Sequence, residues 1–309
     1  MSRPQILIGT RASKLALAQA GAVRDAIAAA AGPGIEVRLE TFSTAGDRIQ
    51  DRTLVEIGGK ALFTLEIEEA LREGRIQCAV HSMKDMPAED PDGLVIGAVP
   101  ERADPRDAFV SRRWASLSEL PAGARVGTAS LRRQAQCLSR RPDLSVFALR
   151  GNVDTRLRKL DSGEADAILL AAAGLGRLGL AHEARALIDP IETPPAPAQG
   201  ALAVQVRMQD AGADWLAALE HPASRLGITA ERASLRVLEG SCRTAIGAYA
   251  RLDADRLKLV VEALTPDGSA RFRREGEIEL AAHPLAAADA LGVRIGRAVR
   301  EAAGDAIEF

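Results

Sequence analysis

The residues best suited to do chemistry stand together in segment 79–87, where a short apolar run ends in ionisable and hydroxyl side chains. The apolar run predicts a buried strand, and Pro87 prevents a simple continuation of regular structure. In α/β proteins, binding and chemistry usually lie at the carboxyl ends of such strands. Asp85, with Ser82 and Lys84 beside it, could therefore act as an acid, a base or a cation-stabilising group. The alternative is that these charges only decorate a solvated turn.

Two other segments, 8–13 and 126–130, combine glycine and serine where a strand is expected to lead into a helix. Ser13 and Ser130 can cap those helices, whose free N–H groups and dipole attract an anion. Arginine side chains at such a helix start oppose the dipole, and an anionic ligand would resolve that conflict. Five arginines lie at or near the expected turns: Arg11, Arg132, Arg133, Arg150 and Arg156. They predict a pocket for several carboxylates or phosphates, unless they are ordinary surface arginines.

The three cysteines differ in their surroundings. Cys78 lies in an apolar run and Cys137 in a helix-like segment, so both are expected to be packed thiols. Cys242 lies in a glycine-containing loop between an expected helix and an expected strand. Because the cysteines lack metal-ligand spacing and the four histidines are scattered, we expect no metal site.

Length, composition and net charge indicate which classes of protein the chain could belong to. The chain has 309 residues, 47% of them hydrophobic and 27% charged, which is typical of a globular protein with two or three domains. A net charge of −2 provides no basic field for nucleic acid. No apolar stretch approaches the roughly 18 residues of a membrane span. The N-terminus leads directly into a strand without a signal-peptide core, so we expect a cytoplasmic protein without a membrane partner.

Strand and helix patterns alternate twice along the chain. The first set comprises strands at 5–10, at 36–43 and up to residue 81, with helices at 13–30 and 63–73. The second set comprises strands at 125–128, 146–150 and 166–171, with helices from residue 130 and at 153–161. The repetition predicts two α/β lobes of like topology with a cleft between them.

A proline-rich segment, 192–200, separates these patterns from the rest of the chain and is expected to cross between lobes. Residues 201–206 then alternate like a strand that could return to the first lobe. A small antiparallel α+β domain follows, with strands at 245–252, 257–264 and 271–280 between helices at 229–238 and 285–303. The expected domains are therefore residues 1–100 with 200–218, residues 105–194, and residues 223–309.

Several long motifs, in chain order, resemble those of the porphobilinogen deaminase (hydroxymethylbilane synthase) family, and the resemblance runs nearly from end to end. They are Gly9–Ser13, Gly58–Phe63, His81–Pro87, Asp104–Phe109, Gly127–Gln134, Leu149–Val153, Gln199–Ala201 and Gly240–Cys242. The resemblance implies two lobes like those of type II periplasmic binding proteins, followed by a C-terminal domain with a three-stranded antiparallel sheet. It also implies a monomer.

The resemblance further implies a reaction. The family condenses four porphobilinogen molecules head to tail, releases ammonia at each step, and hydrolyses off hydroxymethylbilane. Growth starts on a dipyrromethane primer held by a thioether, and by position the attached cysteine is Cys242. Asp85 matches the catalytic carboxylate, which would stabilise positive charge on a pyrrole ring and move protons.

The resemblance also assigns the remaining site residues. Those expected to bind the cofactor are Asp47, Ser82, Lys84, Thr128, Ser130, Arg132, Arg133, Arg150 and Gly151. Those expected to bind substrate are Arg11, Ser13, Phe63, Arg150, Arg156 and Arg177. The chain departs from the family pattern at Ala198, where glycine is usual, and at Gln205, where glutamate is usual. The alternative function is a two-lobed protein that binds or senses an anionic ligand without catalysis, and it would need neither Asp85 nor an accessible Cys242.

Overall fold

Contacts divide the chain into two compact units. The computed structural model describes residues 5–44, 64–238, 244–280 and 282–309. Unit 1 comprises Met1–Ala103 and Ala201–Arg225, and unit 2 comprises Asp104–Gly200 and Leu226–Phe309. No helix within the described residues is long and apolar enough to cross a membrane. The finer division into three domains stays a prediction.

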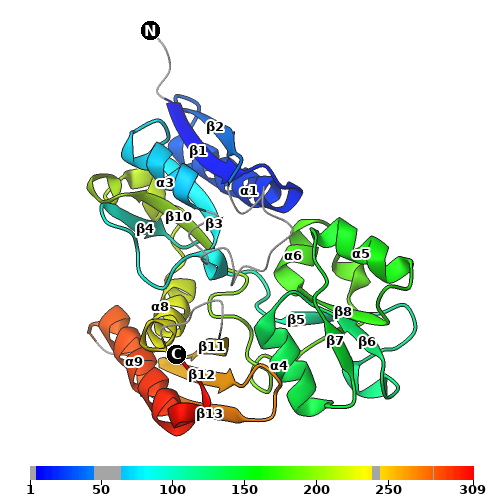
Figure 1. Cartoon of the computed structure of the whole chain (residues 1–309). Helices are drawn as coiled ribbons and strands as arrows, with labels where there is room; N and C mark the ends of the chain where they lie inside the picture. Colours follow the sequence, from blue (N-terminus) through cyan, green and yellow to red (C-terminus); the bar gives the residue numbers. More distant parts are fainter. Residues whose placement is uncertain (1–4, 45–63, 239–243, 281) are drawn as a thin grey trace. The chain divides into compact units, whose positions relative to one another are not determined.

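Unit 1 is built on a five-stranded sheet in the order β2-β1-β3-β10-β4 (Figure 1). The strands are β1 (Gln5–Arg11), β2 (Glu36–Phe42), β3 (Cys78–Ser82), β4 (Leu94–Ala98) and β10 (Leu202–Arg207). β1 runs parallel to β2 and β3, whereas β10 is antiparallel to β3 and β4. The helices are α1 (Lys14–Ala31), α3 (Leu65–Arg72) and α7 (Asp214–Ala217), with 3₁₀ turns at η2 (Met83–Asp85) and η5 (Met208–Asp210).

Helices cover both faces of this sheet because alternate strand residues point to opposite sides. Ile6 and Ile8 pack with apolar residues of α1, among them Ile27. Leu7, between them, packs on the other face with Leu71 of α3. The two hydrophobic layers fix the direction in which β1 and β3 end, and those ends carry the predicted site residues.

Unit 2 contains a second five-stranded sheet in the order β7-β6-β8-β5-β9. Its strands are β5 (Asp107–Val110), β6 (Arg125–Gly127), β7 (Ser145–Phe147), β8 (Ala167–Ala171) and β9 (Ala186–Leu187). The helices are α4 (Leu131–Arg140), α5 (Val153–Asp161) and α6 (Ala172–Arg177), with 3₁₀ turns at η3 (Leu117–Glu119) and η4 (Ala181–Glu183). Cys137 of α4 packs on one face, and Leu157 of α5 packs on the other.

The two sheets share one topology, which confirms the prediction of two similar α/β lobes. In each, one strand, β1 or β6, lies between two parallel neighbours, and an antiparallel strand, β10 or β5, follows in the fourth position. β10 comes from the segment after the proline-rich stretch and lies between β3 and β4. The predicted return of residues 201–206 to the first lobe is therefore confirmed.

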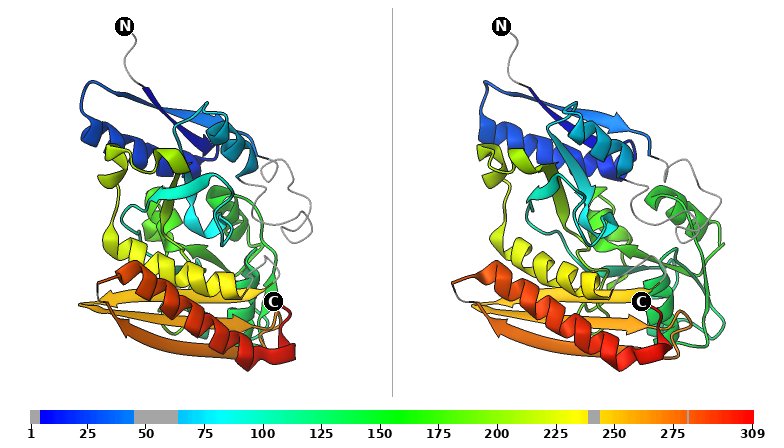
Figure 2. Two further views of the ribbon diagram at one scale, coloured as in Figure 1. Left: turned by 90° about the vertical axis from the view of Figure 1, so that its left-hand side faces the viewer. Right: turned by 60° about the vertical axis from the view of Figure 1, so that its left-hand side comes forward.

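The C-terminal part of unit 2 is the predicted α+β domain with a three-stranded antiparallel sheet. Its elements are α8 (Pro222–Val237), β11 (Ala245–Asp253), β12 (Arg256–Leu264), β13 (Arg271–Glu279), α9 (Pro284–Ala303) and the 3₁₀ turn η6 (Gly304–Ala306). Figure 2 shows α8 and α9 beside the same sheet. The expected start of α8 at residue 229 is wrong, because Pro222 begins the helix and proline is well accommodated in a first helical turn.

Ala198 has a backbone conformation that favours glycine. Its φ is 64°, and the residue is buried. Its N–H donates to a carboxylate oxygen of Glu231 at 2.6 Å, and the other oxygen of that carboxylate accepts from the N–H of Ala250 at 2.8 Å. Glu231 therefore ties the proline-rich segment and β11 to α8, and this tie holds Ala198 in a strained conformation.

We predict that Ala198→Gly raises the stability of the protein by about 1 kcal/mol. The left-handed conformation costs an L-residue roughly 1–2 kcal/mol, and the extra freedom of glycine in the unfolded chain offsets about 0.4–1 kcal/mol of that gain. The measurement is the urea midpoint of unfolding. Ala196→Gly is the matched control because Ala196 has no positive φ, and it should lower the midpoint. A lower midpoint for Ala198→Gly would contradict the prediction.

Candidate functional site

In unit 1, the strand ends bring the first group of predicted residues to one edge of the sheet. β1 and β3 are parallel neighbours, with Ile8 paired to Cys78, so both strands deliver their carboxyl ends to the same side. Arg11 ends β1, and the side-chain oxygen of Ser13 accepts the N–H of Ala16 as the cap of α1. The cap predicted at Ser13 is therefore confirmed.

Asp85 lies at the end of β3, where the sequence places it. It is the last residue of η2 and is half-buried between the fully buried Met83 and Met86. The N–H of Met83 donates to the carbonyl of Ala201 at 3.1 Å, which fastens the turn to the start of β10. In addition, Gln19 of α1 donates to the Ser82 hydroxyl at 2.9 Å. Packing and hydrogen bonds thus fix the backbone that carries Lys84 and Asp85.

His81 lies directly beneath this turn. Its Nε2 lies 3.2 Å from Oε1 of Gln205, and both side chains are buried. Burial lowers the pKa of His81 to about 4, although the hydrogen bond to Gln205 and the charge of Asp85 act in the opposite direction, and the charge of Arg11 lowers it further. At neutral pH the imidazole is therefore uncharged.

In unit 2, the parallel strands β6 and β7 bring the turns that follow them to the same edge of the sheet. The hydroxyl of Ser130 accepts the N–H of Arg133, and the hydroxyl of Thr128 accepts the N–H of Ser130. The cap predicted at Ser130 is thus confirmed. β7 runs parallel to β6, and the segment after it contains Arg150 and Gly151. Gly151 has a φ of 117°, which permits the sharp entry into α5.

Arg132 and Arg133 are both buried, and one carboxylate, that of Asp107, binds them. Arg132 NH1 lies 2.7 Å from one oxygen of Asp107, and Arg133 NH2 lies 2.8 Å from the other. Gln199 also donates to this carboxylate at 2.8 Å. Burial opposes ionisation of Asp107, but the two guanidinium charges outweigh it and hold the pKa of this carboxyl far below its usual range.

Sequence reasoning missed Asp107. We expected an anionic ligand to offset the arginines at the start of α4, and the protein supplies one carboxylate of its own. Asp107 could have been noticed in the sequence because it begins an apolar run, 107–110, that forms a buried strand. A charged side chain in a buried strand needs a partner of opposite charge. The partners lie 25 and 26 positions later, so local pattern could not identify them.

Arg156 of α5 has other cationic side chains near it. Burial lowers the pKa of Arg156 to about 10, and repulsion from Arg133 and Arg150 adds to this effect. Arg156 Nε donates to the Gly151 carbonyl at 2.8 Å, but no carboxylate of the described residues lies within ion-pair distance of its guanidinium. Burial likewise lowers the pKa of Arg177, which donates to the Gly200 carbonyl at 2.7 Å. These partly buried cations would be stabilised by a carboxylate ligand.

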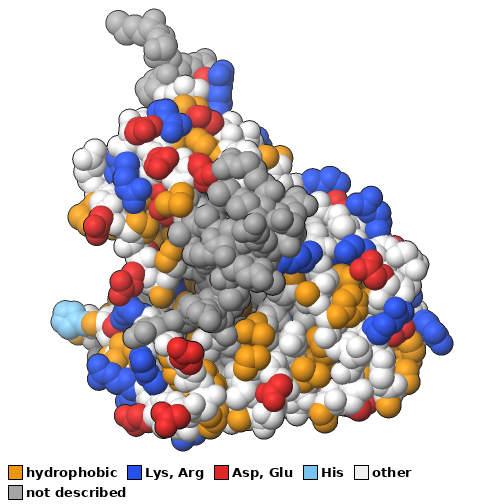
Figure 3. Space-filling model, in the orientation of Figure 1, with side chains coloured by type: hydrophobic (Ala, Val, Ile, Leu, Met, Phe, Trp, Pro, Cys, Tyr) orange, Lys and Arg blue, Asp and Glu red, His pale blue; other side chains and the backbone are white. Residues whose placement is uncertain are grey.

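The exposed charges include both signs. On the face shown in Figure 3, the side chains of Lys and Arg are interspersed with those of Asp and Glu. Arg112, which is exposed, and Arg141, which is partly exposed, form ion pairs with neighbouring carboxylates. Arg156, which has no carboxylate partner among the described residues, therefore differs from these paired surface arginines.

Some predicted residues lie outside the described part of the chain, namely Asp47, Phe63 and Cys242. The two cysteines that are described are buried, and burial raises the pKa of Cys78 to about 12 and that of Cys137 to about 11. Both thiols therefore stay protonated at neutral pH. Among the described residues, no group of three or more His, Cys, Asp or Glu could hold a metal ion.

Comparison with known proteins gives a consistent result over nearly the whole chain. Residues 6–214 match the family model "Porphobilinogen deaminase, dipyromethane cofactor binding domain", and residues 226–301 match "Porphobilinogen deaminase, C-terminal domain". The chain is 59% identical to the porphobilinogen deaminase of Caulobacter sp. (strain K31) over 316 residues, with 99% of both chains covered. It is 58% identical to that of Phenylobacterium zucineum, again with 99% of both covered.

Solved structures give a weaker likeness, which carries no argument about function. One is the methionine-binding protein MetQ, with a TM-score of 0.45 and 16% identity over 70% of this chain and 88% of the other. Another is a periplasmic substrate-binding protein from Coxiella burnetii, with a TM-score of 0.43 and 17% identity over 71% and 93%. The family matches and the full-length relatives, by contrast, are decisive, and the chain belongs to the porphobilinogen deaminase family.

Proposed function

We propose that this chain condenses four porphobilinogen molecules into hydroxymethylbilane, with Asp85 as the catalytic carboxylate and Cys242 as the attachment point of a dipyrromethane cofactor. The observation that carries the proposal is the partly buried guanidinium of Arg156, which burial and repulsion from Arg133 and Arg150 destabilise. Porphobilinogen bears an acetate and a propionate, so every added ring brings two carboxylates that could stabilise this cation.

The residues present fit such a cofactor. Its carboxylates match the charge of Arg133, Arg150 and Arg156. Burial lowers the pKa of Arg156, and repulsion from the other two arginines adds to this effect. At the same edge of the sheet, Thr128 and Ser130 add hydroxyl groups. Gly151, which has a positive φ and no side chain, leaves its backbone accessible to a ligand. When bound, the cofactor supplies a free pyrrole α-carbon that accepts the incoming unit. In unit 1, Ser82 and Lys84 are proposed to contribute a hydroxyl group and a cation to the same ligand.

Asp85 is proposed to stabilise positive charge and to move protons. Loss of ammonia from porphobilinogen leaves an electron-poor methylene group, and formation of the new carbon–carbon bond places positive charge on a pyrrole ring. A carboxylate close to the pyrrole N–H lowers the energy of that cation. Since arginines would repel the cation, one fixed carboxylate is essential. The hydrogen bonds that hold η2 in place support this role.

The substrate is proposed to bind through Arg11, Ser13, Phe63, Arg150, Arg156 and Arg177. A non-catalytic anion-binding protein would use the same arginines, but it would have no need for a carboxylate on the fixed turn η2. We further propose a cytoplasmic monomer that binds neither nucleic acid nor membranes. The net charge of −2 and the mixed surface charge support this part of the proposal.

We predict that Asp85→Asn lowers the rate of ammonia release from porphobilinogen by about 10²–10⁴-fold, the usual contribution of a group that transfers protons. The substitution keeps the shape of the side chain, and its half-buried position at a turn should leave the fold intact. Turnover and circular dichroism are measured on the same preparation. Glu89→Gln, on an exposed residue of the same segment, should keep turnover within about twofold. Near-normal turnover of Asp85→Asn would contradict the assignment.

We also predict that Arg156→Gln raises the KM for porphobilinogen by about 10–100-fold without lowering the melting temperature. A hydrogen bond to a charged group contributes about 1.5–3 kcal/mol, which corresponds to this range. Removal of a cation that is partly buried and repelled by two others should leave the fold at least as stable. Arg158→Gln, on the exposed face of the same helix, is the control and should change KM by less than about twofold. An unchanged KM for Arg156→Gln would contradict the prediction.

A further inference from the structure

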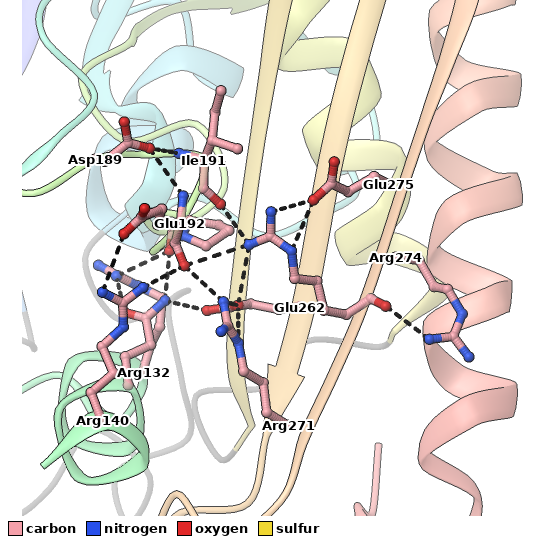
Figure 4. Close-up of polar contacts among 12 residues, drawn as sticks. Arg132, Arg140, Asp189, Ile191, Glu192, Glu262, Arg271, Arg274 and Glu275 are labelled. Carbon is pink, nitrogen blue, oxygen red and sulfur yellow. Dashed lines mark hydrogen bonds and ion pairs between the residues drawn. The ribbon is translucent and has the colours of Figure 1, made fainter.

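A fully buried carboxylate, that of Glu262, lies on β12 at the contact between the C-terminal sheet and α4. One of its oxygens accepts from Gln136 of α4 at 2.6 Å, and the other accepts from Nε of Arg271 at 2.7 Å. Figure 4 shows Glu262 and Arg271 beside the backbone of segment 191–192, where the carbonyl of Glu192 accepts from Arg271 at 2.7 Å. The proposed mechanism above does not use this carboxylate.

Gln136 connects Glu262 to Arg132. Its amide nitrogen donates to Glu262 and also to the carbonyl of Pro194 at 2.8 Å, while its amide oxygen accepts from Arg132 NH1 at 2.7 Å. A carboxylate can only accept and a guanidinium can only donate. The charges at the two ends therefore fix the orientation of the Gln136 amide, and only one of its two flipped states satisfies both neighbours.

The orientation of the Gln136 amide makes its oxygen accept from NH1 of Arg132, so another nitrogen of this guanidinium remains available to a ligand. NH1 of Arg132 is used by Asp107, Gln136 and the Pro194 carbonyl, and NH2 lies 3.3 Å from Asp107. The remaining nitrogen, Nε, is buried and has no hydrogen-bond partner among the described residues. A buried donor without a partner is costly, so a ligand that accepts from Nε would be favoured.

Two glycines permit the close contact between the C-terminal sheet and this part of unit 2. A Cβ at Gly247 of β11 would lie 2.5 Å from the Pro194 carbonyl oxygen. A Cβ at Gly268, which has a φ of 72°, would lie 2.5 Å from the Ala135 carbonyl oxygen in α4. The N–H of Ala248 also donates to the carbonyl of Pro195 at 2.9 Å. α4, the proline-rich segment and the sheet are thus packed backbone to backbone.

We infer that Glu262 is a positioning residue for cofactor attachment, which acts through Gln136 to hold Arg132 and the start of α4 against β11. The inference rests on the proposed function, because it takes Cys242 as the attachment point and Arg132 as a cofactor-binding residue. Cys242 precedes the first residue of β11 by three positions. The hydrogen bonds from Arg132 through Gln136 end at Glu262 on β12, and β12 pairs with β11, where Gly247 lies opposite Glu262. The helix that carries the arginines is therefore connected through β12 to the strand that follows the attachment point.

The test measures how fast the full-length apo chain acquires its cofactor. The chain is produced in cells that cannot make porphobilinogen, is then incubated with porphobilinogen, and is followed by intact mass. Glu262→Gln should slow the gain of two pyrrole units at least tenfold, because an amide at position 262 no longer fixes the orientation of Gln136. Glu277→Gln removes a partner of Arg256 from an exposed ion pair on the same sheet and should load at the wild-type rate.

A second variant separates positioning from stability. The double variant Glu262→Leu, Arg271→Leu replaces the ion pair with apolar side chains, an exchange that is often neutral or stabilising. It should melt no lower than the wild type and still load at least tenfold more slowly, which a merely structural role would not produce. Wild-type loading by either variant in folded form would overturn the inference. Failure of the wild-type chain itself to gain mass would instead refute the proposed function.

Discussion

The sharing of one buried carboxylate by two buried guanidinium groups is the interaction on which unit 2 depends. Asp107 begins β5, and its bonds to Arg132 and Arg133 attach the first turn of α4 to the sheet. Removing one partner from such a buried group costs about 3–5 kcal/mol, because the other charge remains without compensation. Through Gln199, the same carboxylate also holds the end of the proline-rich segment. A single residue therefore sets the positions of a helix, a strand and the segment that leads to β10.

Arg133, which shares this carboxylate, also acts on Arg156, a residue proposed to bind substrate. Burial lowers the pKa of Arg156, and repulsion from Arg133 and Arg150 lowers it further. A ligand with several carboxylates relieves this repulsion as it binds. The carboxylate proposed to stabilise a pyrrole cation lies in the other unit, at the end of β3. The proposed chemistry thus divides between an arginine-bearing unit that binds anions and a unit that contributes Asp85.

The local elements were largely predictable from the sequence, whereas the partners of the buried charges were not. Ser13 and Ser130 precede amphipathic helices and cap them, because a helix start leaves N–H groups that a nearby hydroxyl can satisfy. Asp107 and Glu262 could not be paired with their arginines and glutamine from the sequence, since these contacts depend on how distant elements pack. The helix α8 was expected to begin seven residues late, and short strands such as β9 (Ala186–Leu187) were not expected. The ends of helices and the presence of very short strands depend on which residues the tertiary structure buries, and local periodicity in the sequence does not reveal this burial.

The central claim is that this chain holds a covalent polycarboxylate primer among its arginines, with Cys242 as the attachment point. The most direct measurement is the intact mass of the protein purified from cells that make porphobilinogen. The account predicts a mass above that of the polypeptide by two pyrrole units, and the loss of this increment in Cys242→Ser while the variant remains folded. An unmodified, folded wild-type protein, or an increment that survives Cys242→Ser, would contradict the account.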